Sequence, residues 1–150
     1  MLERYELLSS SISSMYHDIQ KIERVEMAKF GLKGPHAQCM LAMNRYPEGL
    51  TASQLCELCD KDKASISRTV AELEQAGMVV RDTRSGNRYR APLTLTPKGV
   101  MAANAVSQRA LLAVEQAGVG LKDEQRHVFY QVLMLIAGNL HTICKDGLSK

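Results

Sequence analysis

The sequence lacks several features that would place it in common protein classes. No run of apolar residues approaches the roughly eighteen that a membrane-spanning helix needs. The N-terminal segment 1–4 lacks the basic and then apolar pattern of a secretory signal. Four cysteines (Cys39, Cys56, Cys59 and Cys144) are too few for the disulfide framework of a secreted protein. We therefore expect a cytoplasmic protein with free thiols and no membrane partner.

Motifs of catalysis are also missing. The chain has no glycine-rich loop that could cradle a phosphate, no H-E-x-x-H pair and no nucleophile elbow. The four histidines are dispersed without the spacing of metal ligands: His17, His36, His127 and His141. These absences argue against an enzyme and against a resident cofactor or metal.

What the sequence does contain is a local concentration of positive charge. The chain has 150 residues, of which 45% are hydrophobic and 23% charged, an ordinary composition for one globular domain. Between Arg81 and Lys98, five basic residues accompany one acidic residue, a local charge of +4, whereas the whole chain carries only +3. The rest of the chain is therefore slightly acidic, and the basic segment favours an anionic partner.

Two short capped helices precede the basic segment. Thr51 is followed three residues later by Gln54, the pattern of a capping box at a helix start. Asp62 is a suitable N-cap for a second helix over residues 63–76, and Gly77 is suited to end it. The sequence therefore predicts two helices joined by a tight turn.

The second of these helices has two different faces. Ile66, Val70 and Leu73 are spaced four and three residues apart, so they form the buried stripe. The opposite face is small, hydroxylated and basic, and it includes Lys63, Ser67 and Arg68. Such a face suits the major groove of DNA, because hydroxyl groups bond bases or phosphates and arginine can pair with guanine.

A β-hairpin is expected after the second helix. Residues 78–81 and 93–95 have the composition of two short strands, and Ser85-Gly86-Asn87 between them has strong turn chemistry. The connecting loop carries Arg84, Arg88 and Arg90.

Long helices are predicted on both sides of this central segment. The N-terminal one repeats apolar residues at spacings of three and four, and a second helix runs from Pro35 to about Tyr46. After the hairpin, Thr96 and Pro97 open a long helix toward Gly118, and a last apolar helix covers about 122–144. This apolar surface exceeds what the central segment could cover, which indicates packing on a second copy.

The order and spacing of these segments resemble the MarR family of bacterial winged-helix regulators, and the resemblance covers nearly the whole chain. It rests on residues 62–68, 73–81, 82–84 and 95–99. It implies a homodimer that binds an operator in double-stranded DNA and is often released by a small-molecule effector. By position it places Ser65, Ser67, Arg68 and Thr69 at the major groove, and the hairpin, or wing, residue Arg84 in the minor groove, oriented by Asp82.

The chain departs from the family pattern at two places. Lys61 stands in the turn where the family usually has an apolar residue, and the wing is longer than the commonest family wing. Arg88-Tyr89-Arg90 occupies the extra length, with both arginines on one side if the triplet is extended. Which wing arginine reaches DNA is therefore open.

We conclude that the chain is a mainly α protein with a winged helix-turn-helix and a two-stranded wing. Residues 35–99 are expected to bind DNA, and residues 1–34 and 100–150 to form a helical dimerisation region intertwined with it. The predicted function is sequence-specific regulation of transcription by a homodimeric repressor. The predicted DNA-binding residues are Lys63, Ser65, Ser67, Arg68, Thr69, Asp82, Arg84, Arg88 and Arg90.

Two alternatives stay open. Cys56 and Cys59 form a C-x-x-C pair on one helix face, so the same DNA-binding protein could respond to a thiol reagent or a metal. Small buried residues are the simpler interpretation of both cysteines. The second alternative is a winged helix that binds a protein and not DNA, against which the arginine-rich wing argues.

Overall fold

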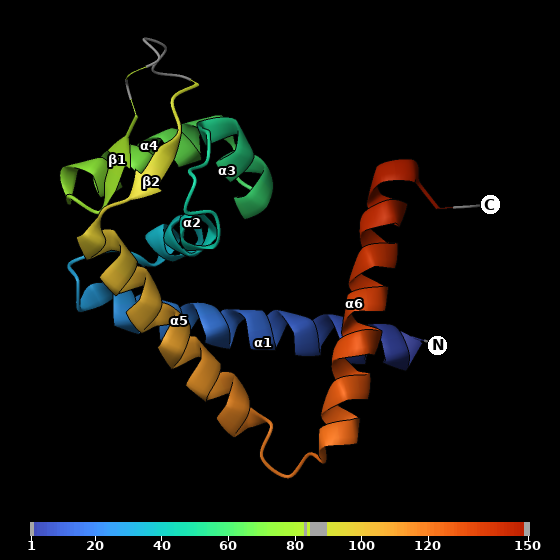
Figure 1. Cartoon of the computed structure of the whole chain (residues 1–150). Helices are drawn as coiled ribbons and strands as arrows, with labels where there is room; N and C mark the ends of the chain where they lie inside the picture. Colours follow the sequence, from blue (N-terminus) through green and yellow to red (C-terminus); the bar gives the residue numbers. More distant parts are fainter. Residues whose placement is uncertain (1, 83, 85–89, 149–150) are drawn as a thin grey trace. The chain divides into compact units, whose positions relative to one another are not determined.

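The computed structural model of the chain describes residues 2–82, 84 and 90–148 (Figure 1). It is mainly helical with one two-stranded sheet, as predicted. Two compact units, Met1–Leu112 and Ala113–Lys150, divide the chain within the fifth helix. The elements in chain order are α1 (Leu2–Ala28), α2 (Gly34–Arg45), α3 (Ala52–Cys59), α4 (Lys63–Gln75), β1 (Val79–Arg81), β2 (Leu93–Leu95), α5 (Pro97–Ala117) and α6 (Asp123–Asp146).

Helices α3 and α4 form the predicted helix-turn-helix, and both predicted caps are present. The Gln54 backbone N–H donates to Thr51 Oγ1 at 3.3 Å, and the Thr51 N–H donates to Gln54 Oε1 at 2.8 Å. Asp62 Oδ1 accepts the Ser65 N–H at 2.8 Å and so caps α4. Local side-chain chemistry therefore sets the start of each helix.

The turn between α3 and α4 requires a left-handed residue, which the sequence analysis did not identify. Asp60 adopts φ 49° and ψ 51°, the sole positive φ of a non-glycine residue in the described part of the chain. Aspartate tolerates this region better than most residues because its short polar side chain bonds locally. The reversal is thus made without glycine.

Helix α4 ends at Gly77, as predicted. Gly77 has φ 70°, its N–H donates to the Glu74 carbonyl at 3.0 Å, and the Met78 N–H donates to the Leu73 carbonyl at 2.9 Å. These two hydrogen bonds form the Schellman motif, which satisfies backbone carbonyls left unpaired at a helix end. It directs the chain straight into β1.

The wing is an antiparallel pair in which Val79 faces Leu95 and Arg81 faces Leu93. A further pairing joins its base to the segment before α3, because Leu50 and Leu93 exchange backbone hydrogen bonds of 3.0 and 2.8 Å. The sequence analysis missed this bridge, since one residue carries no strand pattern. It fixes the wing against the helix-turn-helix.

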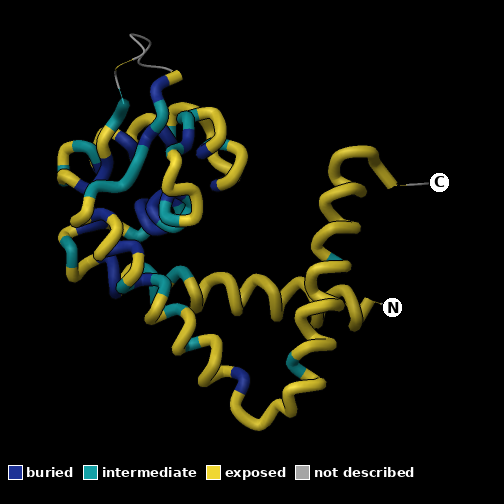
Figure 2. The backbone as a smooth tube through the Cα atoms, viewed as in Figure 1, coloured by how far each residue is buried: buried dark blue, intermediate teal, exposed yellow. Residues whose placement is uncertain are grey.

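The core lies among the winged-helix elements and the first half of α5 (Figure 2). Its largest fully buried side chains are Met27, Met40, Met43, Leu55, Ile66, Val70, Leu73, Met78, Leu93 and Val106. Ile66, Val70 and Leu73 are therefore the buried stripe of α4, as predicted. Methionine fills irregular spaces well, which suits a core where helices and strands meet.

The start of α5 is packed tightly against the end of α4 and β1. Thr96 caps α5 by accepting the Gly99 N–H at 3.1 Å, and its hydroxyl donates to the Gly77 carbonyl at 2.7 Å. The Thr96 N–H donates to the Met78 carbonyl at 2.9 Å. A Cβ added at Gly99 would lie closer than 3.0 Å to that same carbonyl oxygen. Only glycine allows this approach.

Helices α1 and α6 expose apolar side chains. In α1 the predicted apolar seam is largely open, with Tyr5 68% and Ile12 39% exposed. No residue of α6 is buried, and its exposed apolar residues include Phe129, Val132, Leu133, Leu140 and Ile143. By length and composition alone α6 could cross a membrane, at a mean hydropathy of 1.2.

Candidate nucleic-acid interface

The outward face of α4 presents the side chains predicted to read DNA. Lys63, Ser67 and Arg68 are exposed, and Ser65 and Thr69 are half-buried. The face thus combines two cations with three hydroxyl groups on a rigid helix.

The Ser65 hydroxyl is already used as a donor. It donates to Asp62 Oδ2 at 2.7 Å, while the Ser65 N–H donates to Oδ1. Both bonds favour the ionised carboxylate, so they lower the pKa of Asp62. The Ser65 hydroxyl oxygen can therefore accept a hydrogen bond from a ligand. Of the two serines, Ser67 is better placed to donate one.

A buried histidine fixes α4 to α2, and the sequence analysis did not find it. His36 Nδ1 accepts the Lys33 N–H at 3.1 Å, so its other ring nitrogen, Nε2, carries the hydrogen that faces Glu72 Oε2 at 2.7 Å. Lys33 Nζ donates to the same carboxylate at 3.1 Å. The hydrogen bond with His36 has the largest effect on the pKa of Glu72 and lowers it, and the hydrogen bond from Lys33 lowers it further. His36 and Lys33 lie 36 and 39 residues before Glu72 in the chain, so no local sequence pattern predicts these contacts.

The wing carries an oriented arginine. Arg84 Nε donates to Asp82 Oδ1 at 2.9 Å and Nη2 donates to Oδ2 at 2.7 Å, a two-point pairing. The Arg84 side chain is nevertheless 91% exposed. The pairing that the family resemblance implies is therefore present, and it presents the guanidinium to solvent in a held geometry.

The pairing of Arg84 with Asp82 predicts how the Asp82 carboxyl group titrates. The bonds from Arg84 lower the pKa of Asp82 from 3.8 to about 2. Because this pKa is depressed, the pairing is complete above pH 3.8 and is lost as the pH falls toward 2. We expect NMR of the Asp82 carboxyl carbon to show little titration between about pH 3 and 5 in the wild type. In Arg84→Ala the midpoint should rise toward the ordinary value, although the backbone N–H of residue 84 still donates to Asp82. Arg90→Ala is the control; a similar change there would contradict a specific Arg84 pairing.

The other basic residues of this region differ in their surroundings. Arg81 Nε donates to Glu74 Oε1 at 3.2 Å, and its side chain is only 14% exposed. Arg90 is exposed. Arg88 lies outside the described residues, so the choice among the wing arginines is open. Of the basic residues in the described wing, Arg84 is the one held outward by an acidic partner.

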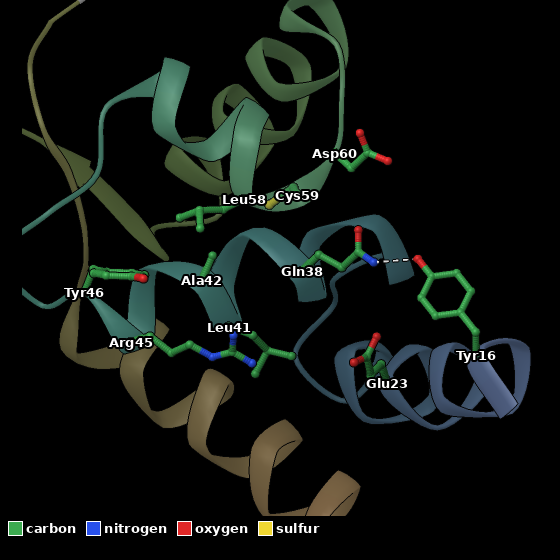
Figure 3. A pocket seen from close by; sticks show the side chains of 10 residues that line it. All are labelled: Tyr16, Glu23, Gln38, Leu41, Ala42, Arg45, Tyr46, Leu58, Cys59 and Asp60. Carbon is green, nitrogen blue, oxygen red and sulfur yellow. Dashed lines mark hydrogen bonds between the residues drawn. The ribbon is translucent and has the colours of Figure 1, made fainter. Parts of the chain in front are cut away.

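A hollow of about 350 Å³ lies beside the helix-turn-helix (Figure 3). Helix α1 supplies Tyr16 and Glu23, and α2 and α3 supply most of the remaining lining: Gln38, Leu41, Ala42, Arg45, Tyr46, Leu58, Cys59 and Asp60. Gln38 Nε2 donates to the Tyr16 hydroxyl at 2.8 Å. Burial raises the pKa of Glu23. The lining therefore combines apolar residues with a larger number of polar and charged ones, among them two carboxylates and one guanidinium.

Comparison with known proteins agrees with the geometry. Residues 30–91 match the model of the MarR family. A curated relative described as a putative transcriptional regulatory protein for the hcr operon, from Thauera aromatica, is 36% identical over 78 residues. The aligned stretch covers 52% of this chain and 47% of that relative, about half its length.

Solved structures share the fold over almost the whole chain. A MarR transcriptional regulator from Methanosarcina mazei Go1 superposes with a TM-score of 0.81 at 20% identity, covering 92% of each chain. The S. aureus MepR–DNA complex gives a TM-score of 0.74 at 14% identity, covering 87% of this chain and 96% of that one. At these identities the likeness establishes the fold.

Helix-turn-helix, wing and basic outward face together define a winged helix-turn-helix protein. The predicted resemblance agrees with the comparison, because the segment that matches the MarR family model, residues 30–91, runs from α2 to the wing. The curated relative and the solved structures named above are described as regulators of transcription or as a DNA complex.

Proposed function

We propose that this chain binds double-stranded DNA sequence-specifically and regulates transcription. The observation that carries the proposal is the outward face of α4, where Ser67 and Arg68 are exposed, beside a wing whose Arg84 is held outward by Asp82. Helix α4 would enter the major groove, where Arg68 can donate two bonds to guanine. Arg84 would enter the adjacent minor groove, whose narrow A/T-rich segments attract guanidinium.

We propose that the functional form is a homodimer. The support is the exposed apolar face of α6, together with the open seam of α1. A dimer would place two copies of α4 in successive major grooves, about 34 Å apart. Light scattering should give twice the chain mass for the wild type and a smaller mass for Leu133→Glu. A monomeric wild type would contradict the proposal.

DNA binding itself is tested by fluorescence anisotropy. The purified protein is titrated with the DNA upstream of its own gene and with scrambled DNA of equal length, at several salt concentrations. A preference of about a thousandfold with steep salt dependence is the expected result for a specific regulator. An absence of binding to any DNA would favour the alternative of a protein-interaction module.

We propose further that the protein is a repressor released by a small effector bound in the hollow of Figure 3. Its walls combine Leu41 and Leu58 with the polar groups of Tyr16 and Arg45, which suits a small amphipathic molecule. Because Glu23 and Asp60 also line the hollow, an acidic group of the ligand would have to lie beside Arg45. Because the hollow is bounded by α2 and α3, a ligand there would bias the position of the helix-turn-helix.

The effector proposal has its own test. Small aromatic acids are screened for those that raise the unfolding temperature and lower DNA affinity. Arg45→Ala should abolish both responses and leave DNA binding without ligand unchanged. An effector that acts equally on the variant would contradict this site. A reporter gene that is silenced by the protein and released by the ligand would establish repression.

The alternative of a metal site at Cys56 and Cys59 gains no support. Among the described residues, no group of three or more histidine, cysteine, aspartate or glutamate side chains is arranged to hold a metal ion. Cys59 is instead in contact with Cys39, on another helix.

A further inference from the structure

Two buried cysteines from different helices form a pair that C-x-x-C spacing does not predict. Cys39 Sγ in α2 lies 3.8 Å from Cys59 Sγ in α3. Their residues are 2% and 8% exposed. Cys56, the C-x-x-C neighbour of Cys59, is not bonded to it among the described contacts. The two thiols are therefore core residues whose sulfur atoms are in direct contact.

The pair can be reached by a small molecule. Both cysteines line a hollow of about 430 Å³ bounded by α2, the α3–α4 turn and α4, and Cys59 also lines the hollow of Figure 3. Lys61 and Arg68 line the same hollow, so its surface is partly cationic. A space of this volume admits a small organic peroxide.

The two thiols differ in their affinity for a proton. The hydrogen bond between the two sulfur atoms, together with the positive charge of Lys61, lowers the pKa of Cys59. The same bond and burial raise the pKa of Cys39. Cys59 is therefore the sulfur that ionises first, and thiolate is the reactive form.

We propose that Cys39 and Cys59 form a redox-reactive dithiol site that hydroperoxides convert to a disulfide. The Cys59 thiolate attacks the outer oxygen of the hydroperoxide; an S–O bond forms, the O–O bond breaks, and the alcohol leaves after taking a proton. Cys39 sulfur then attacks Cys59 sulfur; the S–S bond forms, the S–O bond breaks, and hydroxide leaves as water with the Cys39 proton. The sum is two thiols and one hydroperoxide giving a disulfide, an alcohol and water.

Closing the pair would change the helix-turn-helix. The sulfur atoms must approach from 3.8 Å to about 2.05 Å. Cys59 is the last residue of α3, directly before the left-handed Asp60 that starts the turn to α4. Drawing Cys59 toward α2 therefore shifts the turn that positions α4. This regulatory part rests on the proposed function, and it predicts that oxidation weakens specific DNA binding about tenfold, reversibly.

The chemistry is tested without DNA. Reduced full-length protein is treated with a slight excess of cumene hydroperoxide, capped with iodoacetamide and digested with trypsin. Cleavage after Lys33, Arg45 and Lys61 yields peptide 34–45 with Cys39 and peptide 46–61 with Cys56 and Cys59. We expect these two peptides to be joined in the wild type and in Cys56→Ser. They should remain separate in Cys39→Ala and Cys59→Ala.

Each other outcome overturns a definite part of the inference. A bridge within peptide 46–61, or oxidation confined to exposed Cys144, would refute the Cys39–Cys59 pair. A 34–45 to 46–61 bridge that leaves DNA affinity within twofold of the reduced protein would refute the regulatory part alone. If the reduced protein binds no DNA while the bridge forms, the proposed function fails and the dithiol site stands. Reduction with dithiothreitol tests whether the oxidation is reversible. The Cys56→Ser variant tests whether the bridge needs Cys56.

Discussion

Replacing Gly99 with alanine is expected to lower the free energy of unfolding by about 3 kcal/mol, the upper part of the usual range for overpacking. The added Cβ would collide with the Met78 carbonyl oxygen and would lie 3.1 Å from the Met78 carbonyl carbon. Backbone atoms cannot rotate away as a flexible side chain does. The same oxygen accepts the Thr96 N–H, so any retreat would also break the connection between β1 and α5. Urea denaturation followed by circular dichroism measures the loss.

The matched control is Gly138→Ala in α6. Nothing lies within 4 Å of a Cβ at Gly138, and no left-handed conformation requires glycine there. Alanine favours a helix interior over glycine by about 0.5–1 kcal/mol, so this variant should be slightly more stable. Both variants are compared at one protein concentration, because association would contribute to stability. Equal midpoints for Gly99→Ala and the wild type would refute the close approach of α5 to β1.

Arg68→Ala is expected to weaken specific DNA binding by about 1 to 3 kcal/mol and to relax the preference at one operator position. The side chain is exposed on the outward face of α4, while the buried stripe on the other face is untouched. The loss should therefore appear in affinity and not in the unfolding transition. Anisotropy titrations on the operator and on its single-base variants measure both effects.

Two further variants separate base recognition by Arg68 from the general effect of removing a positive charge. Arg4→Ala removes the same charge from the exposed surface of α1 and should leave the operator preference unchanged. Arg84→Ala should lower the salt slope by about one, because one cationic contact with DNA is lost. An equal loss of affinity for operator and random DNA would indicate a phosphate contact, and a larger loss for an A/T-rich operator would indicate the minor groove. Normal operator binding by Arg68→Ala would show that α4 does not read bases through this side chain.

The features predicted well from the sequence are those set by neighbours along the chain. Thr51 and Asp62 cap their helices through bonds to residues three positions on, and Gly77 ends α4 by its own backbone freedom. The stripe of Ile66, Val70 and Leu73 follows from helical periodicity alone. Each depends on fewer than about ten consecutive residues, which a sequence pattern can report.

The features missed depend on contacts that only the fold brings together. His36 meets Glu72 and Cys39 meets Cys59 across 36 and 20 residues. Neither pair has a spacing that periodicity could single out. Leu50 joins Leu93 through a one-residue bridge. For Cys59 the preferred interpretation, a small core residue, agrees with its burial, but its contact with Cys39 could not be predicted, because Cys39 belongs to another helix.

The junction at Met78 has a thermodynamic consequence. The end of α4, the start of β1 and the first turn of α5 share the bonds of Thr96 to Gly77 and Met78, and Lys98 Nζ adds a bond to the Ala76 carbonyl at 3.3 Å. A displacement of either helix would therefore strain the same hydrogen bonds. Under the proposed function, it follows from linkage that a ligand or contact that acts on α5 through this junction would change the DNA affinity of α4, and that DNA would change the affinity for that ligand or contact by the same factor.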